Sequence, residues 1–186
     1  MVAGMDGRLR TTATLGASRT ERDFDEPLGF YRFSTFDSDQ LAADLLSSLS
    51  LRRDDIATIG LSWDREEAET TNTIGTTRNA GLDAGVDTWA VFGQYVAAVT
   101  EDLTLTAGLR HDDHEGFGGA TTWRGTAAYA LGDGGTVLRA SYGTARKAPS
   151  LFQLYDPMFG NATLQAEKSC GLDAGVEQTL ADGRLT

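Results

Sequence analysis

Two short runs of histidine and acidic residues contain the side chains of this sequence that could do chemistry. One is His111-Asp-Asp-His114, and the other runs from Asp64 to Glu69. Imidazole and carboxylate groups are common ligands of zinc and calcium. Residues three apart in a strand point to opposite faces, so the two histidines converge only if the chain turns between them. The acidic run lacks the spacing of an EF-hand loop, and Ca²⁺ binding there is the alternative. We expect polar strand ends, with no metal site and no cofactor.

The patterns typical of enzymes are not recognisable in the sequence. There is no Ser-His-Asp arrangement, zinc-ligand spacing or phosphate-binding loop. The segment GDGGT at 132–136 predicts a turn, because it joins two strand-like segments with no helix behind it. The single Cys170 is expected to be a small packing residue rather than a nucleophile. We therefore predict that the chain is not an enzyme.

The composition excludes some partners and leaves one membrane class open. The 186 residues include 22 glycines and carry a net charge of −11, which argues against nucleic acid as a partner. No run approaches the ~20 apolar residues of a membrane helix. A mean hydropathy of −0.27 does not exclude membrane strands, because every second residue of such a strand faces the lumen.

Alternation of apolar and polar residues is the main structural signal. From Leu103 to Leu109 the odd positions are apolar and the even positions are polar or glycine. The same period of two predicts about eight strands of roughly 8–12 residues, similar to the ~9–11 residues of a tilted strand that crosses a bilayer. These strands begin near Leu9, Leu41, Ala57, Trp89, Leu103, Thr122, Leu138 and Ser169.

The connections between these strands alternate in length. Tight turns are predicted at 52–55, 101–102, 132–135 and 181–183, and long polar segments at 18–40, 67–88 and 147–168, with a shorter one at 114–119. Outer-membrane barrels have short periplasmic turns and long external loops. The fold prediction is therefore all-β: an antiparallel transmembrane β-barrel, present here in part as about eight long meander strands of a larger barrel.

The predicted faces separate aromatic and aliphatic side chains from charged ones. Four aromatic residues are expected to point outward near the long-loop end and form one girdle: Trp63, Trp89, Trp123 and Tyr142. The aliphatic residues expected on the convex, lipid side are Ile59, Leu61, Leu105, Ala107, Leu109, Ala127 and Leu172. The charged residues expected to face the lumen are Arg110, Arg124, Arg139, Asp173 and Glu177. In a large barrel these charges can stay in water or contact a separate plug.

The segment from Tyr142 to Gln178 resembles part of the barrel of TonB-dependent outer-membrane receptors. That family often shows a Phe-Lys-Ala-Pro-like signature, a Leu-Tyr pair, a Gly-Asn-x-x-Leu-x-Pro-Glu element and a strand of the form Ser-x-x-x-Glu-x-Gly-x-Glu. The matching residues here are Arg146, Lys147, Ala148, Pro149, Leu154, Tyr155, Gly160, Asn161, Leu164, Glu167, Ser169, Asp173, Gly175 and Glu177. Arg146 replaces the usual aromatic residue, Ala166 the proline and Asp173 the glutamate.

The resemblance implies a function and a set of partners. It implies that 1–186 is a fragment of the barrel domain of a receptor in the outer membrane of a Gram-negative cell, with the plug domain absent. The implied activity is energised uptake of a scarce metal-bearing nutrient, either cobalamin or a ferric siderophore, and the Gln-Leu-Tyr segment favours the cobalamin branch. The implied partners are outer-membrane lipid, a plug domain, TonB and a small metal-chelate ligand. The missing signal peptide and a last strand that begins only after Gly183 fit a fragment.

The polar excursion between 147 and 166 is the predicted site of ligand capture. It collects apolar side chains that a merely solvated loop would rarely carry. The residues expected to contribute are Phe152, Tyr155, Met158, Phe159 and Asn161. The alternative is that these side chains only pack against neighbouring loops. Two other interpretations of the whole chain stay open: a complete eight-stranded barrel of structural or porin type, and a soluble β-sandwich that binds a ligand.

Overall fold

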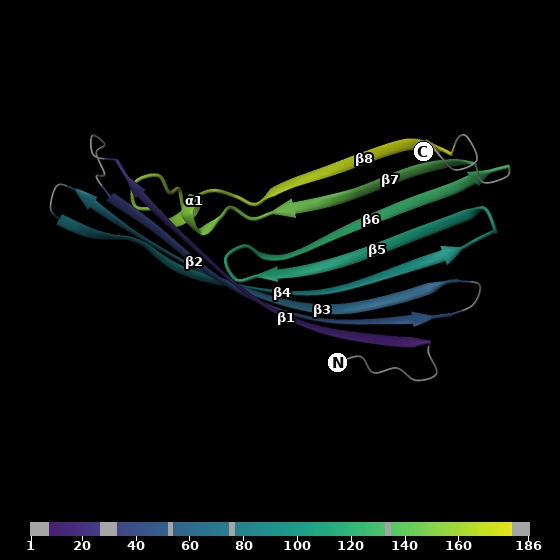
Figure 1. The fold of residues 1–186 in the computed structure, drawn as a ribbon, viewed down its shortest axis with the longest axis horizontal. Coiled ribbons are helices and arrows are strands. Elements are labelled where there is room, and N and C mark those ends of the chain that lie inside the picture. The colour runs from purple at the N-terminus through teal and green to yellow at the C-terminus, as the bar shows by residue number, and fades with distance from the viewer. Residues whose placement is uncertain (1–7, 27–32, 52–53, 75–76, 133–134, 180–186) are drawn as a thin grey trace.

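A computed structural model describes residues 8–26, 33–51, 54–74, 77–132 and 135–179 (Figure 1). These described residues form eight strands and one short helix. In order these are β1 (Leu9–Asp25), β2 (Phe33–Ser50), β3 (Ile56–Ile74), β4 (Thr77–Ala98), β5 (Leu103–His114), β6 (Gly118–Leu131), β7 (Thr136–Lys147), α1 (Leu151–Tyr155) and β8 (Glu167–Gln178). No helix of the described segments is long and apolar enough to cross a membrane.

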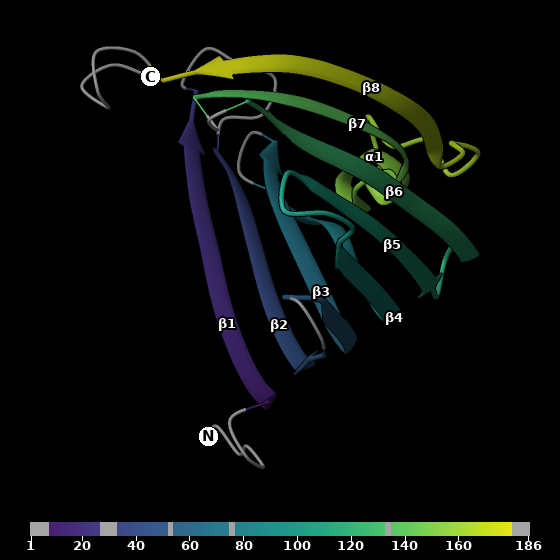
Figure 2. The ribbon, with the colours of Figure 1, turned by 90° about the vertical axis from the view of Figure 1, so that its right-hand side faces the viewer.

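All eight strands belong to one antiparallel sheet in which each strand pairs with the next along the chain. This confirms the predicted fold class, a meander that forms part of a barrel wall. Within the described residues β1 and β8 are the two edges of the sheet, so the eight strands do not close on themselves. A sandwich of two packed sheets is ruled out by the single sheet. The sheet is curved, and α1 lies on its concave side (Figure 2).

The strand register places apolar side chains together on one face. One cross-strand row consists of Ala57, Tyr95, Ala107, Gly125, Tyr142 and Leu172. Along β5 the residues of this face are exposed, apart from Leu103, and those of the other face are partly covered. Side chains spread apart on a convex surface and crowd on a concave one, so the apolar face is the convex face. Leu172 is 75% exposed and Ile59 61% exposed on it.

Strands β1 to β4 are much longer than the sequence pattern predicted. They contain 17, 18, 19 and 22 residues and continue through most of 18–40 and 67–88, so the predicted loops there were wrong. At about 3.3 Å per residue, β4 is about 70 Å long, well beyond a bilayer. Polar residues on both faces hide the alternation, whereas cross-strand contacts such as the Thr35–Thr71 hydroxyl pair (2.7 Å) support the pairing.

The shorter connections follow the prediction more closely. The segment at 114–119 is a tight turn, and Gly118 begins β6 with a φ of 64°. At the opposite end of the sheet, Asp55 accepts hydrogen bonds from the Tyr95 hydroxyl and the Ala98 N–H, both at 2.8 Å. The turn predicted at 181–183, and residues 52–53 and 133–134 of two others, lie outside the described residues.

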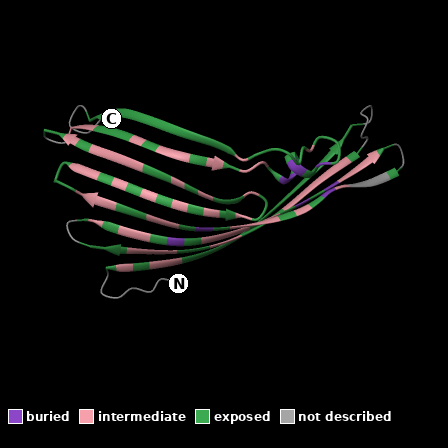
Figure 3. Ribbon diagram, turned by 180° about the vertical axis from the view of Figure 1, so that it is seen from behind, coloured by how far each residue is buried: buried purple, intermediate pink, exposed green. Residues whose placement is uncertain are grey.

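The third long segment, 147–168, contains the helix α1 rather than a purely irregular loop. Leu151 and Leu154 on α1 are 4% and 7% exposed. Leu151 joins Ala68 of β3 and Leu82 of β4 in a buried cluster, against which Phe36, Ala84 and Val86 pack. Buried positions are drawn in purple on α1 and on the strands (Figure 3). The helix is therefore docked on the extended part of the sheet.

Candidate ligand-binding site

The backbone around α1 is fixed by local hydrogen bonds. The Gln153 N–H donates to the Ser150 hydroxyl (3.3 Å), and the Ser150 N–H donates to Oε1 of Gln153 (3.0 Å), which forms a capping box. After the helix, Oδ1 of Asp156 accepts the N–H groups of Met158 (3.0 Å) and Phe159 (2.8 Å). The loop therefore presents its side chains from a defined backbone.

The apolar side chains predicted to capture ligand are less buried than the two leucines of α1. Leu151 and Leu154 lie three residues apart and face the sheet, whereas Phe152 lies on the other side of α1 and Tyr155, four residues after Leu151, lies beside the docked face. Phe152, Tyr155, Met158 and Phe159 are all exposed, and Phe159 is 68% exposed. Asn161 differs, because its Oδ1 accepts from the N–H (3.0 Å) and the hydroxyl (2.7 Å) of Thr163 and so shapes the loop itself.

A cleft of about 850 Å³ lies between α1, the concave face of β3 and β4, and the turn from β5 to β6. Its apolar lining comes from residues such as Val86, Phe117, Leu151, Leu154 and Tyr155. Its charged lining consists of Asp64, Glu66, Glu115 and Lys147. The cleft thus combines one apolar wall with a wall of mixed but mainly negative charge.

Neutral donors hold two of these carboxylates. Oδ2 of Asp64 accepts from the Gln40 amide at 2.8 Å, and Oε2 of Glu115 accepts from the Asp87 N–H at 3.2 Å. His114 also lines the cleft, and its Nδ1 accepts from the Gly116 N–H at 3.0 Å.

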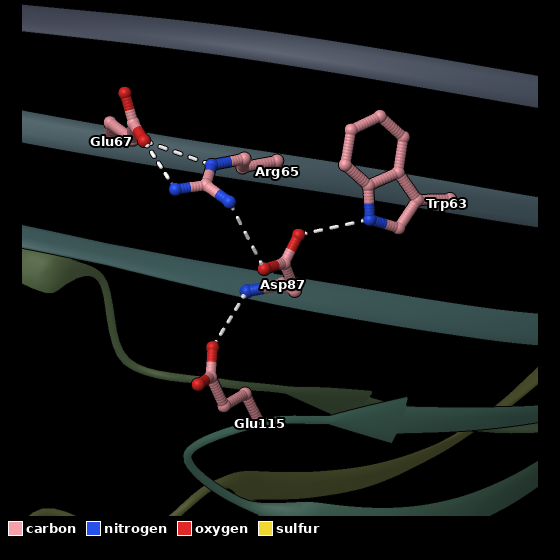
Figure 4. A network of polar contacts seen from close by, with 5 residues as sticks. All are labelled: Trp63, Arg65, Glu67, Asp87 and Glu115. Carbon is pink, nitrogen blue, oxygen red and sulfur yellow. Dashed lines mark hydrogen bonds and ion pairs between the residues drawn. The ribbon is translucent and has the colours of Figure 1, made fainter.

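A polar network on β3 and β4 connects Trp63 with Arg65, Glu67, Asp87 and the cleft residue Glu115 (Figure 4). The Trp63 indole N–H donates to Asp87 at 2.9 Å, and the Arg65 guanidinium contacts Glu67 at 2.6 Å and Asp87 at 3.5 Å. The hydrogen bond to Glu67, and then the charges of Glu67 and Asp87, raise the pKa of Arg65 above its usual value. The backbone N–H of Asp87 also donates to the Glu115 carboxylate. Asp87 thus contacts Trp63 and Arg65 through its side chain and the cleft residue Glu115 through its backbone.

The five charged residues predicted for the lumen share the concave face, and each contacts a polar or charged side chain there. Arg110 pairs with Asp112 at 2.8 Å and lies over the Phe92 ring, and Arg139 pairs with Glu177 at 2.7 Å. Ser141 links the remaining two, since Arg124 donates to its hydroxyl and that hydroxyl donates to Asp173, both at 3.2 Å. The charges are thus largely balanced within the wall.

The two histidines of the HDDH segment are separated in the structure. Nδ1 of His111 lies 2.8 Å from the Thr121 hydroxyl, whereas His114 lies on the concave face and contacts Gly116. Among the described residues no cluster of His, Cys, Asp and Glu could hold a metal ion. The segment is a polar strand end.

Comparison with known proteins now identifies the family. The family model described as TonB dependent receptor-like, beta-barrel matches residues 4–186. The chain belongs to this family. The vitamin B12 transporter BtuB of Vibrio cholerae serotype O1 is 44% identical over 92 residues, which cover 46% of this chain and 15% of that protein. The chain therefore spans only about 15% of the length of this curated relative.

Solved structures of TonB-dependent receptors share the fold. A mutant of the ferric enterobactin receptor of Pseudomonas aeruginosa matches 98% of this chain and 31% of its own, with a TM-score of 0.80 and 21% identity. The siderophore receptor PirA of the same species matches 95% of this chain and 40% of its own, with a TM-score of 0.62 and 20% identity. At these identities the comparison shows the fold alone.

The residues of the family motif lie on the two sides of α1 in the sequence, on β7 and on β8. Lys147 ends β7 opposite Glu167, which begins β8, and Ser169, Asp173 and Gly175 follow along β8. Ala148 and Pro149 connect β7 to the Ser150 cap. Arg146, which replaces the family's aromatic residue, donates to the backbone carbonyls of Phe117 and Gly118 at 2.6 and 3.1 Å. This substitution ties the loop base to the turn that lines the cleft.

The sequence prediction missed the helix and the cleft carboxylates. The helix had a readable signal, because Ser150-Leu-Phe-Gln153 is a capping-box sequence with leucines three residues apart at 151 and 154. The sequence pattern places the carboxylates Asp64 and Glu66 in an acidic run and does not indicate that they face a cleft. Their position opposite α1 depends on the length of β3 and on the docking of α1 against strands that are distant in the sequence. The local pattern of apolar and polar residues encodes neither.

Proposed function

We propose that this chain forms part of the barrel domain of an outer-membrane receptor for energised uptake of a scarce metal-bearing nutrient. In this proposal the convex apolar face contacts outer-membrane lipid, and the concave face with its arginines and carboxylates lines the lumen. A plug domain and TonB are the partners in the complete receptor. The membership in the TonB-dependent receptor family supports each of these assignments.

The observation that carries the proposal is the α1 loop. It is anchored to the sheet by Leu151 and Leu154, yet it exposes Phe152, Tyr155, Met158 and Phe159 beside a large cleft. Exposed apolar clusters on a fixed backbone are costly in water and are typical of binding surfaces. We propose that these side chains make the first apolar contacts with the ligand at the external end of the barrel.

Cobalamin is the ligand that we favour. The curated relative with 44% identity is a vitamin B12 transporter, and the Gln153-Leu-Tyr155 segment resembles the same branch. A corrinoid has a broad, largely apolar face, which suits exposed aromatic and thioether side chains. A ferric siderophore is the neighbouring possibility within the family.

The loop's role can be tested in the full-length receptor with a pair of exchanges. Phe152→Ser combined with Phe159→Ser should lower binding of labelled cyanocobalamin at limiting concentration by about tenfold, because two exposed aromatic contacts are lost. Phe24→Ser is the matched control, since Phe24 is also exposed but lies on β1 outside the cleft. Binding at the wild-type level in the double variant, with an assembled barrel, would contradict a role in capture.

A further inference from the structure

We infer that the cleft beneath α1 admits uncharged or positively charged groups of a ligand and excludes anionic ones. The inference deepens the proposed function, because it assigns the charge class of the group that enters the site. It rests on the charges that face the cleft from every element around it, and on the neutral donors that hold them.

The cleft has an excess of negative charge. Its lining includes three carboxylates, Asp64, Glu66 and Glu115, and one ammonium group, Lys147. His114 also lines the cleft, where its Nδ1 accepts from the Gly116 N–H, and α1 contributes the uncharged Gln153 and Tyr155. At neutral pH the lining therefore carries a net negative charge.

Two of the carboxylates are held in place by neutral donors rather than by ion pairs. The Gln40 amide holds Asp64 and a backbone N–H holds Glu115, so both are oriented by neutral groups. None of the ion pairs of the described residues involves Asp64, Glu66 or Glu115. Lys147, which lies opposite Glu167 in the register of β7 and β8, is the one ammonium group in the lining against three carboxylates.

The arginine side chains near the cleft do not reverse its net negative charge. Arg110 lies on the same concave face but pairs with Asp112 at 2.8 Å, and Arg65 pairs on the convex side with Glu67 and Asp87, although its charge also interacts with that of Glu115. Arg146 donates to the carbonyls of Phe117 and Gly118, so one guanidinium and the Lys147 ammonium group stand against three carboxylates. A half-enclosed cleft with one apolar wall strengthens the field of fixed charges. An anionic chelate such as a ferric tricatecholate would be repelled there, whereas a neutral corrinoid or an ammonium-bearing chelate would not.

A thiol placed in the cleft measures its charge without any ligand. Thr88 lines the cleft and lies opposite Asp64 in the register, so Thr88→Cys in a Cys170→Ala background reports the local field. In the full-length receptor in outer-membrane vesicles, a cationic methanethiosulfonate should react about tenfold faster than an anionic one, after normalisation to a free thiol. Adding Asp64→Asn and Glu66→Gln should bring the ratio close to that of the free thiol.

The matched control is Asp113→Asn, which removes a carboxylate from the exposed convex face of β5 and should leave the ratio unchanged. The second measurement is equilibrium binding of three ferric chelates: a tricatecholate, a neutral cyclic trihydroxamate and a linear trihydroxamate with a free ammonium group. The tricatecholate should bind most weakly of the three. A faster anionic reagent, or tightest binding of the tricatecholate, would overturn the inference. Absence of binding by all three chelates and by cyanocobalamin, with the thiol ratio as expected, would overturn the proposed function while supporting the inferred charge of the cleft.

Discussion

Gly160 lies where the chain turns back after α1, and this single residue decides the shape of the candidate site. Its N–H donates to the carbonyl of Asp156 at 2.8 Å, and a Cβ at this position would lie 2.4 Å from that oxygen and 2.6 Å from the Asp156 nitrogen. Because both atoms belong to the backbone, they cannot move aside as a flexible side chain would. The family's Gly-Asn element therefore has a steric reason at this position.

Replacing Gly160 by alanine should loosen the loop without affecting the barrel. We expect a local destabilisation of about 1–3 kcal/mol, because the turn must shift to admit the Cβ. Hydrogen exchange of 150–164 in the full-length receptor should become faster, and cyanocobalamin binding weaker. Gly171→Ala is the control, since a Cβ there meets open space. Equal exchange rates in the two variants would show that the close approach to Asp156 does not constrain the loop.

At the scale of elements, α1 works as a small platform because its two leucines are buried while its aromatic residues are not. The helix has only five residues, too short to persist by itself in water. Its capping box and its contacts with Ala68 and Leu82 supply the missing stability. Ligand capture by the exposed side chains therefore depends on the docking of α1 on the sheet.

Leu154→Ala should therefore weaken ligand capture although Leu154 faces away from the exposed aromatic residues. Truncating a buried leucine costs about 2–5 kcal/mol, which exceeds what a one-turn helix can tolerate. We expect faster hydrogen exchange in α1 and a loss of cyanocobalamin binding comparable to that of the Phe152/Phe159 double variant. Phe152→Ala alone should leave the exchange rates of α1 unchanged, because Phe152 does not hold the helix. If Leu154→Ala keeps both exchange and binding at wild-type values, the platform is not required.

The elements also show which parts of the structure the sequence predicts. Leu103 to Leu109 alternate without exception, and β5 follows that pattern closely because one face is apolar and the other polar. Beyond Trp63, Glu66 to Thr73 are polar on both faces apart from Ala68, so period two no longer shows even though β3 continues to Ile74. Pairing there depends on neighbouring strands. The cleft is hard to predict from the sequence for the same reason, since Glu66 reaches α1 only because β3 is long.

At the scale of the whole molecule, the curvature and the register together give the sheet two chemically different surfaces. The convex surface carries exposed aliphatic residues between two levels of aromatic side chains, with Trp123 opposite Leu109 and Tyr129 opposite Leu103. The concave surface carries balanced charge pairs. Leu105 lies between the two aromatic levels, opposite Ala127 and Ala97. This arrangement places Leu105 nearer to the middle of the proposed lipid contact than Leu109.

The cost of a charge on the convex surface should therefore depend on depth. In the full-length receptor refolded into phospholipid bilayers, Leu105→Arg should lower the free energy of unfolding by about 2–4 kcal/mol, and Leu109→Arg by about 0–1 kcal/mol, because the guanidinium reaches the interface from the level of Trp123. Thr106→Arg is the control, since Thr106 lies on the polar, concave face. Denaturant titration of the three variants gives the comparison directly. Similar costs for Leu105→Arg and Thr106→Arg would mean that the convex surface does not face lipid, and the proposed membrane position of this wall would have to be abandoned.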